Sequence, residues 1–238
     1  LEAYADLLWF PTGGGKTEAY LGVAAFTMAI RRLQGNLGGM DSGRGLSVIM
    51  RYTLRLLTVQ QFQRASTLLC AMEAQRQKHP EVWGAEPFTL GLWVGGQTSP
   101  NTFEDSKRSV MDARNGRNVG GSSPAQLATC PWCGAEIDPK RDIEAHEDTR
   151  QTVLYCSDHH CMFSAAKDCG GLPVKVVDEE MYHRPPSMMI ATADKFAQMA
   201  WRGGVRTLFG YADKECPRHG IVFPDDEKCN GNHTKPAT

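Results

Sequence analysis

The first half of the chain alternates short apolar runs with longer stretches in which apolar residues return every three or four positions. The runs predict buried strands, and the periodic stretches predict helices. In chain order these are residues 7–10, 46–50 and 88–94 for the strands, and residues 17–32 and 54–77 for the helices. Strands that alternate with helices in this way form a parallel sheet with right-handed connections. We therefore expect residues 1–126 to begin an α/β domain.

The pattern weakens after residue 99 and returns near the end of the chain. A helix is predicted at residues 103–114, and the alternation resumes with strands at residues 174–177 and 188–192 and a helix at residues 194–201. These segments indicate a domain that is interrupted by an insertion. We expect an inserted zinc-binding module at residues 127–170, a return to the first domain at residues 171–213, and a Cys- and His-containing loop at residues 214–238.

A glycine-rich loop ending in Lys16 and Thr17 separates the first strand from the first helix. Backbone N–H groups of such a loop surround phosphate oxygens, and the N-terminus of the following helix adds positive potential. Lys16 then reaches the terminal phosphates, and the Thr17 hydroxyl ligates Mg²⁺. The alternative is a plain glycine-rich turn, and Phe10 stands where the motif usually opens with a small residue. We expect ATP and magnesium to be bound by Pro11, Thr12, Gly13, Gly14, Gly15, Lys16, Thr17 and Glu18.

Composition and charge narrow the choice of partners. The 238-residue chain has a net charge of −1, so any grip on nucleic acid must come from local basic groups. The longest apolar run, residues 21–30, is too short to cross a bilayer, and Leu1 leads into acidic residues rather than into a secretory signal. We therefore expect a cytoplasmic protein without membrane contact. The first residue is not methionine and the end at Thr238 is abrupt, so a piece of a longer protein is expected.

The eight cysteines point to metal rather than to disulfides. Without a secretory signal a reducing compartment is expected, where Cys-x-x-Cys pairs more often bind metal. Cys130 and Cys133 form such a pair, and Cys156 and Cys161 supply a second pair of thiols. They predict a structural zinc ribbon whose four thiolates leave no open coordination position; unrelated buried thiols are the alternative. Nearby donors leave the fourth ligand open: His159, His160 and Cys169.

A second group of metal-binding residue types lies close to the end of the chain. It consists of Cys216, His219, Cys229 and His233. Because a second Cys-x-x-Cys pair is missing, a second zinc site and ordinary loop residues both remain open. Cys70 lies beside apolar residues of the predicted long helix and is expected in the core.

Taken together, these segments resemble the first RecA-like domain of superfamily 2 helicases. Residues 11–17 are similar to motif I, residues 51–61 to motif Ia, Gly95-Gly96 to the glycine pair after the next strand, and residues 190–196 to the motif that precedes motif II. Ala193 replaces the proline of that last motif. The amino-acid sequence of residues 8–22 and 50–64, together with the inserted cysteine module, most resembles the DrmA family, the helicase-like components of the DISARM anti-phage systems.

The resemblance implies a P-loop, RecA-like parallel sheet with helices on both faces, and ATP-driven translocation on DNA or unwinding of DNA. Lys16 would stabilise the charge on the transferring phosphoryl group, and Thr17 would position Mg²⁺. The resemblance also implies a DrmB-like partner protein. The resemblance also implies that the matching motif residues contact the phosphates of single-stranded DNA. These residues are Arg51, Thr53, Arg55, Gly95, Gly96, Thr192 and Lys195.

Residues 174–179 imitate the apolar strand and acidic pair of motif II. They precede the motif at Thr192, whereas motif II follows it in superfamily 2, and Lys175 interrupts the strand. We therefore interpret the acids as solvated residues at the end of a strand. The motif II carboxylates are then expected beyond Thr238, and the fragment alone is expected to be inactive. A P-loop ATPase that remodels a protein, and a nucleotide-sensing zinc-bearing module, remain open as alternatives.

Overall fold

The computed structural model describes residues 5–7, 15–37, 39–53, 55–117, 121–167, 169–212, 214–223 and 233–235. Pro11, Thr12, Gly13 and Gly14 of the glycine-rich loop lie outside these residues, as does Cys229. Leu7 is described, belongs to no strand and is 91% exposed. The other residues of the strand predicted for residues 7–10 lie outside the described part of the chain.

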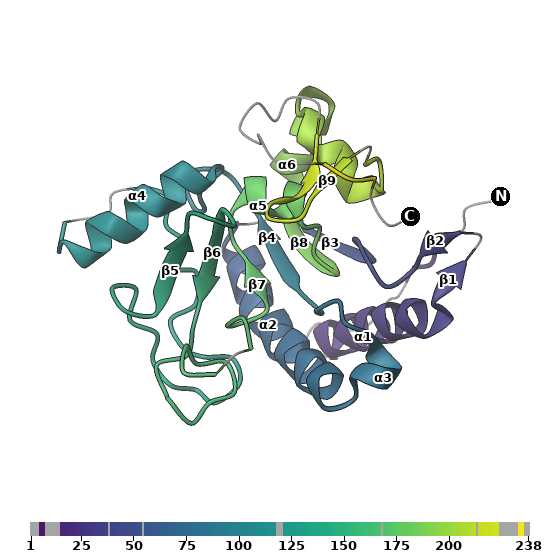
Figure 1. The fold of residues 1–238 in the computed structure, drawn as a ribbon, viewed down its shortest axis with the longest axis horizontal. Helices are drawn as coiled ribbons and strands as arrows, with labels where there is room; N and C mark the ends of the chain where they lie inside the picture. The colour runs from purple at the N-terminus through teal and green to yellow at the C-terminus, as the bar shows by residue number, and fades with distance from the viewer. Residues whose placement is uncertain are drawn as a thin grey trace.

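Four parallel strands form the central sheet (Figure 1). Their order across the sheet is β3 (Val48–Tyr52), β8 (Met188–Thr192), β4 (Leu90–Trp93) and β7 (Val174–Lys175). The late strand β8 therefore lies between two strands that precede it in the sequence. In the register of the sheet, Tyr52 pairs with Thr192, and Trp93 pairs with Ala191. The carboxyl ends of β3, β8 and β4 consequently meet at one edge.

Long helices cover one face of the sheet. They are α1 (Lys16–Gln34) and α2 (Arg55–Lys78), and the short α3 (Pro80–Trp83), which follows α2, packs against both. Phe62, Ala65 and Leu69 recur at helical spacing on α2, and all three are buried against Leu90 and Leu92 of β4. Cys70 lies in the same cluster, as expected, and burial raises the pKa of its thiol. This apolar contact is the larger part of the core.

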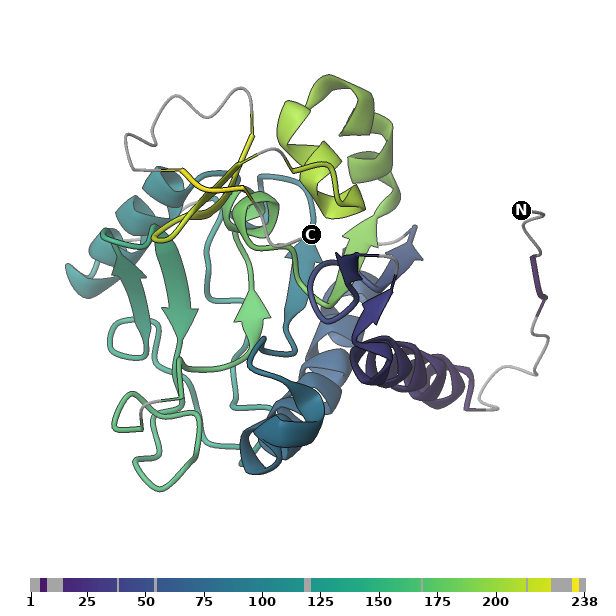
Figure 2. The ribbon, with the colours of Figure 1, turned by 45° about the vertical axis from the view of Figure 1, so that its right-hand side comes forward.

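A second cluster covers the opposite face. It is built by α5 (Asp178–His183), α6 (Ala193–Gln198), and the 3₁₀ segments η1 (Met199–Trp201) and η2 (Gly203–Phe209). Side chains alternate along a strand, so Trp93 points to this face while Leu92 points to the other. Trp93 Nε1 donates a hydrogen bond to the Tyr182 hydroxyl at 3.0 Å. Figure 2 shows residues 193–209 well apart from α1 and α2, and the predicted α/β fold with helices on both faces is confirmed.

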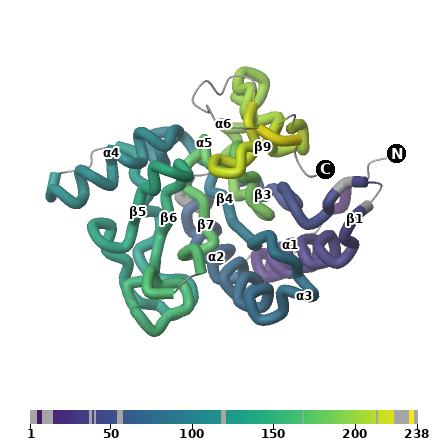
Figure 3. Tube along the Cα trace, in the orientation of Figure 1, coloured from purple at the N-terminus to yellow at the C-terminus, as the bar shows by residue number. Residues whose placement is uncertain are grey.

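Smaller elements complete the described chain (Figure 3). Helix α4 (Phe103–Arg114) is followed by an antiparallel hairpin of β5 (Ile143–His146) and β6 (Gln151–Leu154). The hydroxyls of Ser106 and Thr152 lie 2.7 Å apart and join α4 to β6. Two further hairpins are β1 (Asn36–Leu37) with β2 (Met40–Asp41), and β9 (Lys214–Cys216) with β10 (Gly220–Val222). None of the helices in the described part of the chain is long and apolar enough to cross a membrane.

Candidate functional site

The described part of the glycine-rich loop is its last glycine, which directly precedes a helix. Gly15 has φ 74°, in the left-handed region that favours glycine, and α1 begins at the next residue. Lys16 and Thr17 therefore lie in the first helical turn, where the orphan N–H groups gather. Glu18 follows on the exposed side and accepts a hydrogen bond from Arg64 Nη1 of α2 at 3.2 Å. This pair joins the end of the loop to the helix that resembles motif Ia.

Most of the residues predicted to contact DNA lie at the edge where the strands end. Arg51 is exposed near the end of β3, and Thr53 is exposed just beyond it. Thr192 ends the neighbouring β8, and its hydroxyl is buried without a hydrogen-bond partner among the described residues. Gly95 and Gly96 follow β4 and are exposed, and Arg55 is the first residue of α2. Segments far apart in the sequence are thus brought together at one edge.

Lys195 does not occupy this surface. It is 1% exposed, and its ammonium forms an ion pair with Asp178 and donates a hydrogen bond to Asn101 Oδ1 at 3.1 Å. It also lies 5.9 Å from the ring centre of Trp93. The predicted contact of Lys195 with a phosphate is therefore wrong for this structure. A buried ammonium needs a carboxylate beside it, and the first residue of α5 supplies one.

Asp178 and Glu179 were expected to be solvated but are not, and the next acid, Glu180, is buried as well. Asp178 is fully buried, and burial raises the pKa of its carboxyl to about 6 while Lys195 opposes the rise. Glu179 accepts hydrogen bonds from the Phe103 backbone N–H at 2.8 Å and from Arg150 at 2.7 Å. Glu180 accepts one from the Thr152 backbone N–H, and burial raises its pKa to about 7. These carboxyls fasten α5 to α4, to the β5–β6 hairpin and to α6.

One of the two glycines after β4 is in close contact with this polar cluster. A Cβ at Gly96 would lie 2.4 Å from Asn101 Nδ2, whereas nothing would lie within 4 Å of a Cβ at Gly95. Asn101 is the residue that accepts the hydrogen bond from Lys195. The backbone at Gly96, the Asn101 amide and the buried ion pair therefore form one connected layer under the sheet edge.

The four predicted zinc ligands come together. The Sγ atoms of Cys130, Cys133, Cys156 and Cys161 all lie within 4.8 Å of one another. Cys133 and Cys156 are 3.4 Å apart, and Cys130 and Cys161 are 4.0 Å apart. Four thiolates around a tetrahedral zinc ion with Zn–S bonds near 2.3 Å would be about 3.8 Å apart, so the cluster fits zinc. His159, His160 and Cys169 lie outside this cluster.

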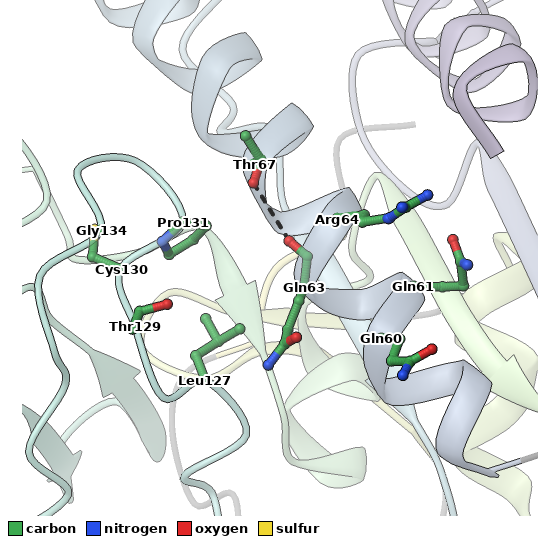
Figure 4. A pocket seen from close by; sticks show the side chains of 10 residues that line it. All are labelled: Gln60, Gln61, Gln63, Arg64, Thr67, Leu127, Thr129, Cys130, Pro131 and Gly134. Carbon is green, nitrogen blue, oxygen red and sulfur yellow. Dashed lines mark hydrogen bonds between the residues drawn. The ribbon is translucent and has the colours of Figure 1, made fainter. Parts of the chain in front are cut away.

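A cleft of about 720 Å³ separates α2 from the loop that carries this first cysteine pair (Figure 4). Polar residues of α2 form one wall, and residues 127–134 around Cys130 form the other. Gln63 lies between the helix and the loop, and Arg64, the partner of Glu18, is on the same helix (Figure 4). The cleft is lined by Gln60, Gln61, Gln63, Arg64, Thr67, Leu127, Thr129, Cys130, Pro131 and Gly134.

The chain was compared with protein-family models and with curated proteins. No protein-family model matches it. The chain is 36% identical, over 241 aligned positions, to DISARM protein DrmA of Bacillus paralicheniformis. The alignment covers 97% of this chain and 21% of that protein, so the chain spans about a fifth of the length of this curated relative. Over nearly all of its residues, the chain is therefore a relative of DISARM protein DrmA.

Proposed function

We propose that the chain is the first RecA-like domain of an ATP-dependent DNA translocase or helicase that acts in bacterial anti-phage defence. The observation that carries this proposal is the common edge of β3, β8 and β4. The segments that resemble motif Ia, the glycine pair and the motif before motif II end there as neighbours. In open parallel sheets, ligands bind outside the carboxyl ends of the strands.

In this proposal the end of the glycine-rich loop binds the triphosphate. The ammonium of Lys16 stabilises negative charge on the transferring phosphoryl group, and the Thr17 hydroxyl holds Mg²⁺. ATP supplies the free energy for movement along DNA. The ion pair of Glu18 with Arg64 gives the loop a direct connection to α2, which is the helix proposed to follow the DNA backbone.

The proposed DNA contacts are those that remain on the surface. Arg51 supplies a cation, the Thr53 hydroxyl a donor, and the backbone at Gly95 a close approach for a phosphate. Contacts of this kind position a strand without reading its sequence. Lys195 takes a different role in the proposal: through Asn101 it positions the loop that carries the glycine pair.

Zinc in the four-thiolate cluster is proposed to be structural. Four protein ligands leave no position for a substrate or for water. The cluster joins the loop at residues 130–134, which precedes the β5–β6 hairpin in the sequence, to the loop at residues 156–161, which follows it. It thereby shapes one wall of the cleft beside α2. A DrmB-like protein partner is proposed on the relationship to DrmA.

The proposal is tested by the salt dependence of single-stranded DNA binding to the intact protein, measured by fluorescence anisotropy. Arg51→Gln should weaken binding and reduce the slope of log K against log salt by about one, because one phosphate contact is lost. Arg108→Gln is the matched control, since Arg108 is exposed on α4 away from the sheet edge. Equal slopes in both variants and the wild type would contradict the assignment of this edge to DNA.

A further inference from the structure

The hairpin of β9 and β10 brings two metal-binding side chains together outside the four-cysteine cluster. Cys216 ends β9, and His219 lies in the turn before β10. Both are buried, and Cys216 Sγ lies 3.7 Å from His219 Nδ1. Sulfur and nitrogen ligands of one tetrahedral zinc ion, with bonds near 2.3 and 2.0 Å, would be about 3.5 Å apart. The two side chains therefore have the separation of two ligands of one ion.

The turn also repeats the local pattern of the first zinc knuckle. Residues 130–134 read Cys-Pro-Trp-Cys-Gly, and residues 216–220 read Cys-Pro-Arg-His-Gly. In both, the glycine after the second ligand has a left-handed backbone, with φ 83° at Gly134 and 91° at Gly220. A Cβ at Gly220 would also lie 2.3 Å from the carbonyl oxygen of His183. The same knuckle, with histidine in place of its second cysteine, is thus held against α5.

A third candidate ligand, His233, lies in the segment 233–235, which pairs with the hairpin. The backbones of Glu215 and Thr234 exchange two hydrogen bonds, of 2.8 and 2.9 Å, as an antiparallel bridge. In such a pairing the next residue of one segment is opposite the preceding residue of the other. His233 therefore occupies the register position opposite Cys216, and opposed residues share a face.

We infer that Cys216 and His219 are two ligands of a second structural zinc site at the β9–β10 hairpin, with His233, at the facing register position, as the candidate for a third ligand. The ion would fasten the hairpin and residues 233–235 to each other beside α5. The site would be independent of nucleotide and DNA. Cys229, the remaining candidate from the sequence, lies outside the described residues.

The test is the zinc content of the intact protein, measured by inductively coupled plasma mass spectrometry. Cys216→Ser and His219→Ala should each lose one equivalent of zinc relative to the wild type. A variant that combines Cys216→Ser with Cys133→Ser should lose two, because it removes a ligand from each site. Cys169→Ser and His159→Ala are matched controls outside both ligand sets and should keep the wild-type content. Wild-type zinc content in Cys216→Ser would overturn the inference.

A conservative variant keeps the test decisive if those substitutions prevent folding. His219→Cys retains a donor and should retain the zinc. After replacement of zinc by cobalt(II), its thiolate-to-cobalt charge-transfer band should be stronger than that of the wild type, because one imidazole has become a thiolate. An unchanged band would overturn the inference and would leave the contact between Cys216 and His219 as an S–H···N hydrogen bond.

Discussion

Lys195 and Asp178 form an ion pair beneath the edge where the central strands end. Asp178 begins α5 just after β7, and Lys195 lies in α6 just after β8. Strand β4 separates these two strands in the sheet, so the pair reaches across it. Asn101 extends the connection to the backbone at Gly96. Lys195, which the sequence predicted to contact DNA, thus positions the loop with Gly96 that is proposed to contact DNA.

Breaking this pair from one side should destabilise the protein strongly. Lys195→Met leaves the carboxylate of Asp178 buried without its cation, and such losses cost about 3–5 kcal/mol. The double variant with Asp178→Leu should recover much of that loss, because no charge then remains buried. Urea unfolding followed by tryptophan fluorescence measures the coupling. Single effects that simply add in the double variant would show that the pair does not act as a unit.

The two glycines after β4 should respond differently to alanine. Gly95→Ala meets open space and should change the free energy of unfolding by less than about 0.5 kcal/mol. Gly96→Ala displaces the Asn101 amide and should cost about 1–3 kcal/mol. Thermal unfolding by circular dichroism compares the two. Equal destabilisation by the two variants would mean that the Asn101 side chain can move away from the added methyl group at position 96 without a loss of stability.

Removal of zinc should loosen the inserted hairpin and leave the parallel sheet intact. Metal binding to a thiolate cluster contributes folding free energy to the segments it joins. After treatment with a chelator, backbone amides of β5 and β6 should exchange hydrogen faster, while those of β4 and β8 keep their protection. Cys133→Ser should reproduce this pattern, and Cys169→Ser, which lies outside the cluster, should not. Unchanged exchange in β5 and β6 would argue against a metal-dependent module.

Local patterns predicted the elements well because they depend on neighbouring residues. The periodic stretch at residues 54–77 became α2 (Arg55–Lys78), and the helix at residues 103–114 has the predicted bounds. The four cysteines were found from spacing alone, since thiol pairs of this type have few other uses in a reducing compartment. The apolar run at residues 188–192 likewise became β8 with no change of bounds.

Long-range pairings were beyond the sequence pattern. The position of β8 between β3 and β4 depends on which strands pair with each other, and this pairing joins residues far apart in the sequence. Lys195 looked exposed because its partner, Asp178, comes from a different connection of the sheet. Asp178 and Glu179 were interpreted as solvated for the same reason: their donors lie on α4, on α6 and in the turn of the inserted hairpin. The cleft beside α2 was missed because its two walls are distant in the chain.

We propose above all that Lys16 belongs to a site that hydrolyses ATP and that DNA stimulates this hydrolysis. The most direct test is ATP hydrolysis by the intact protein with and without single-stranded DNA, beside Lys16→Ala and a control, Lys140→Ala, in an exposed turn. We predict strong stimulation by DNA in the wild type and the control. Lys16→Ala should abolish it, because phosphoryl transfer loses its charge stabilisation. Turnover that ignores DNA, or that survives Lys16→Ala, would contradict the account.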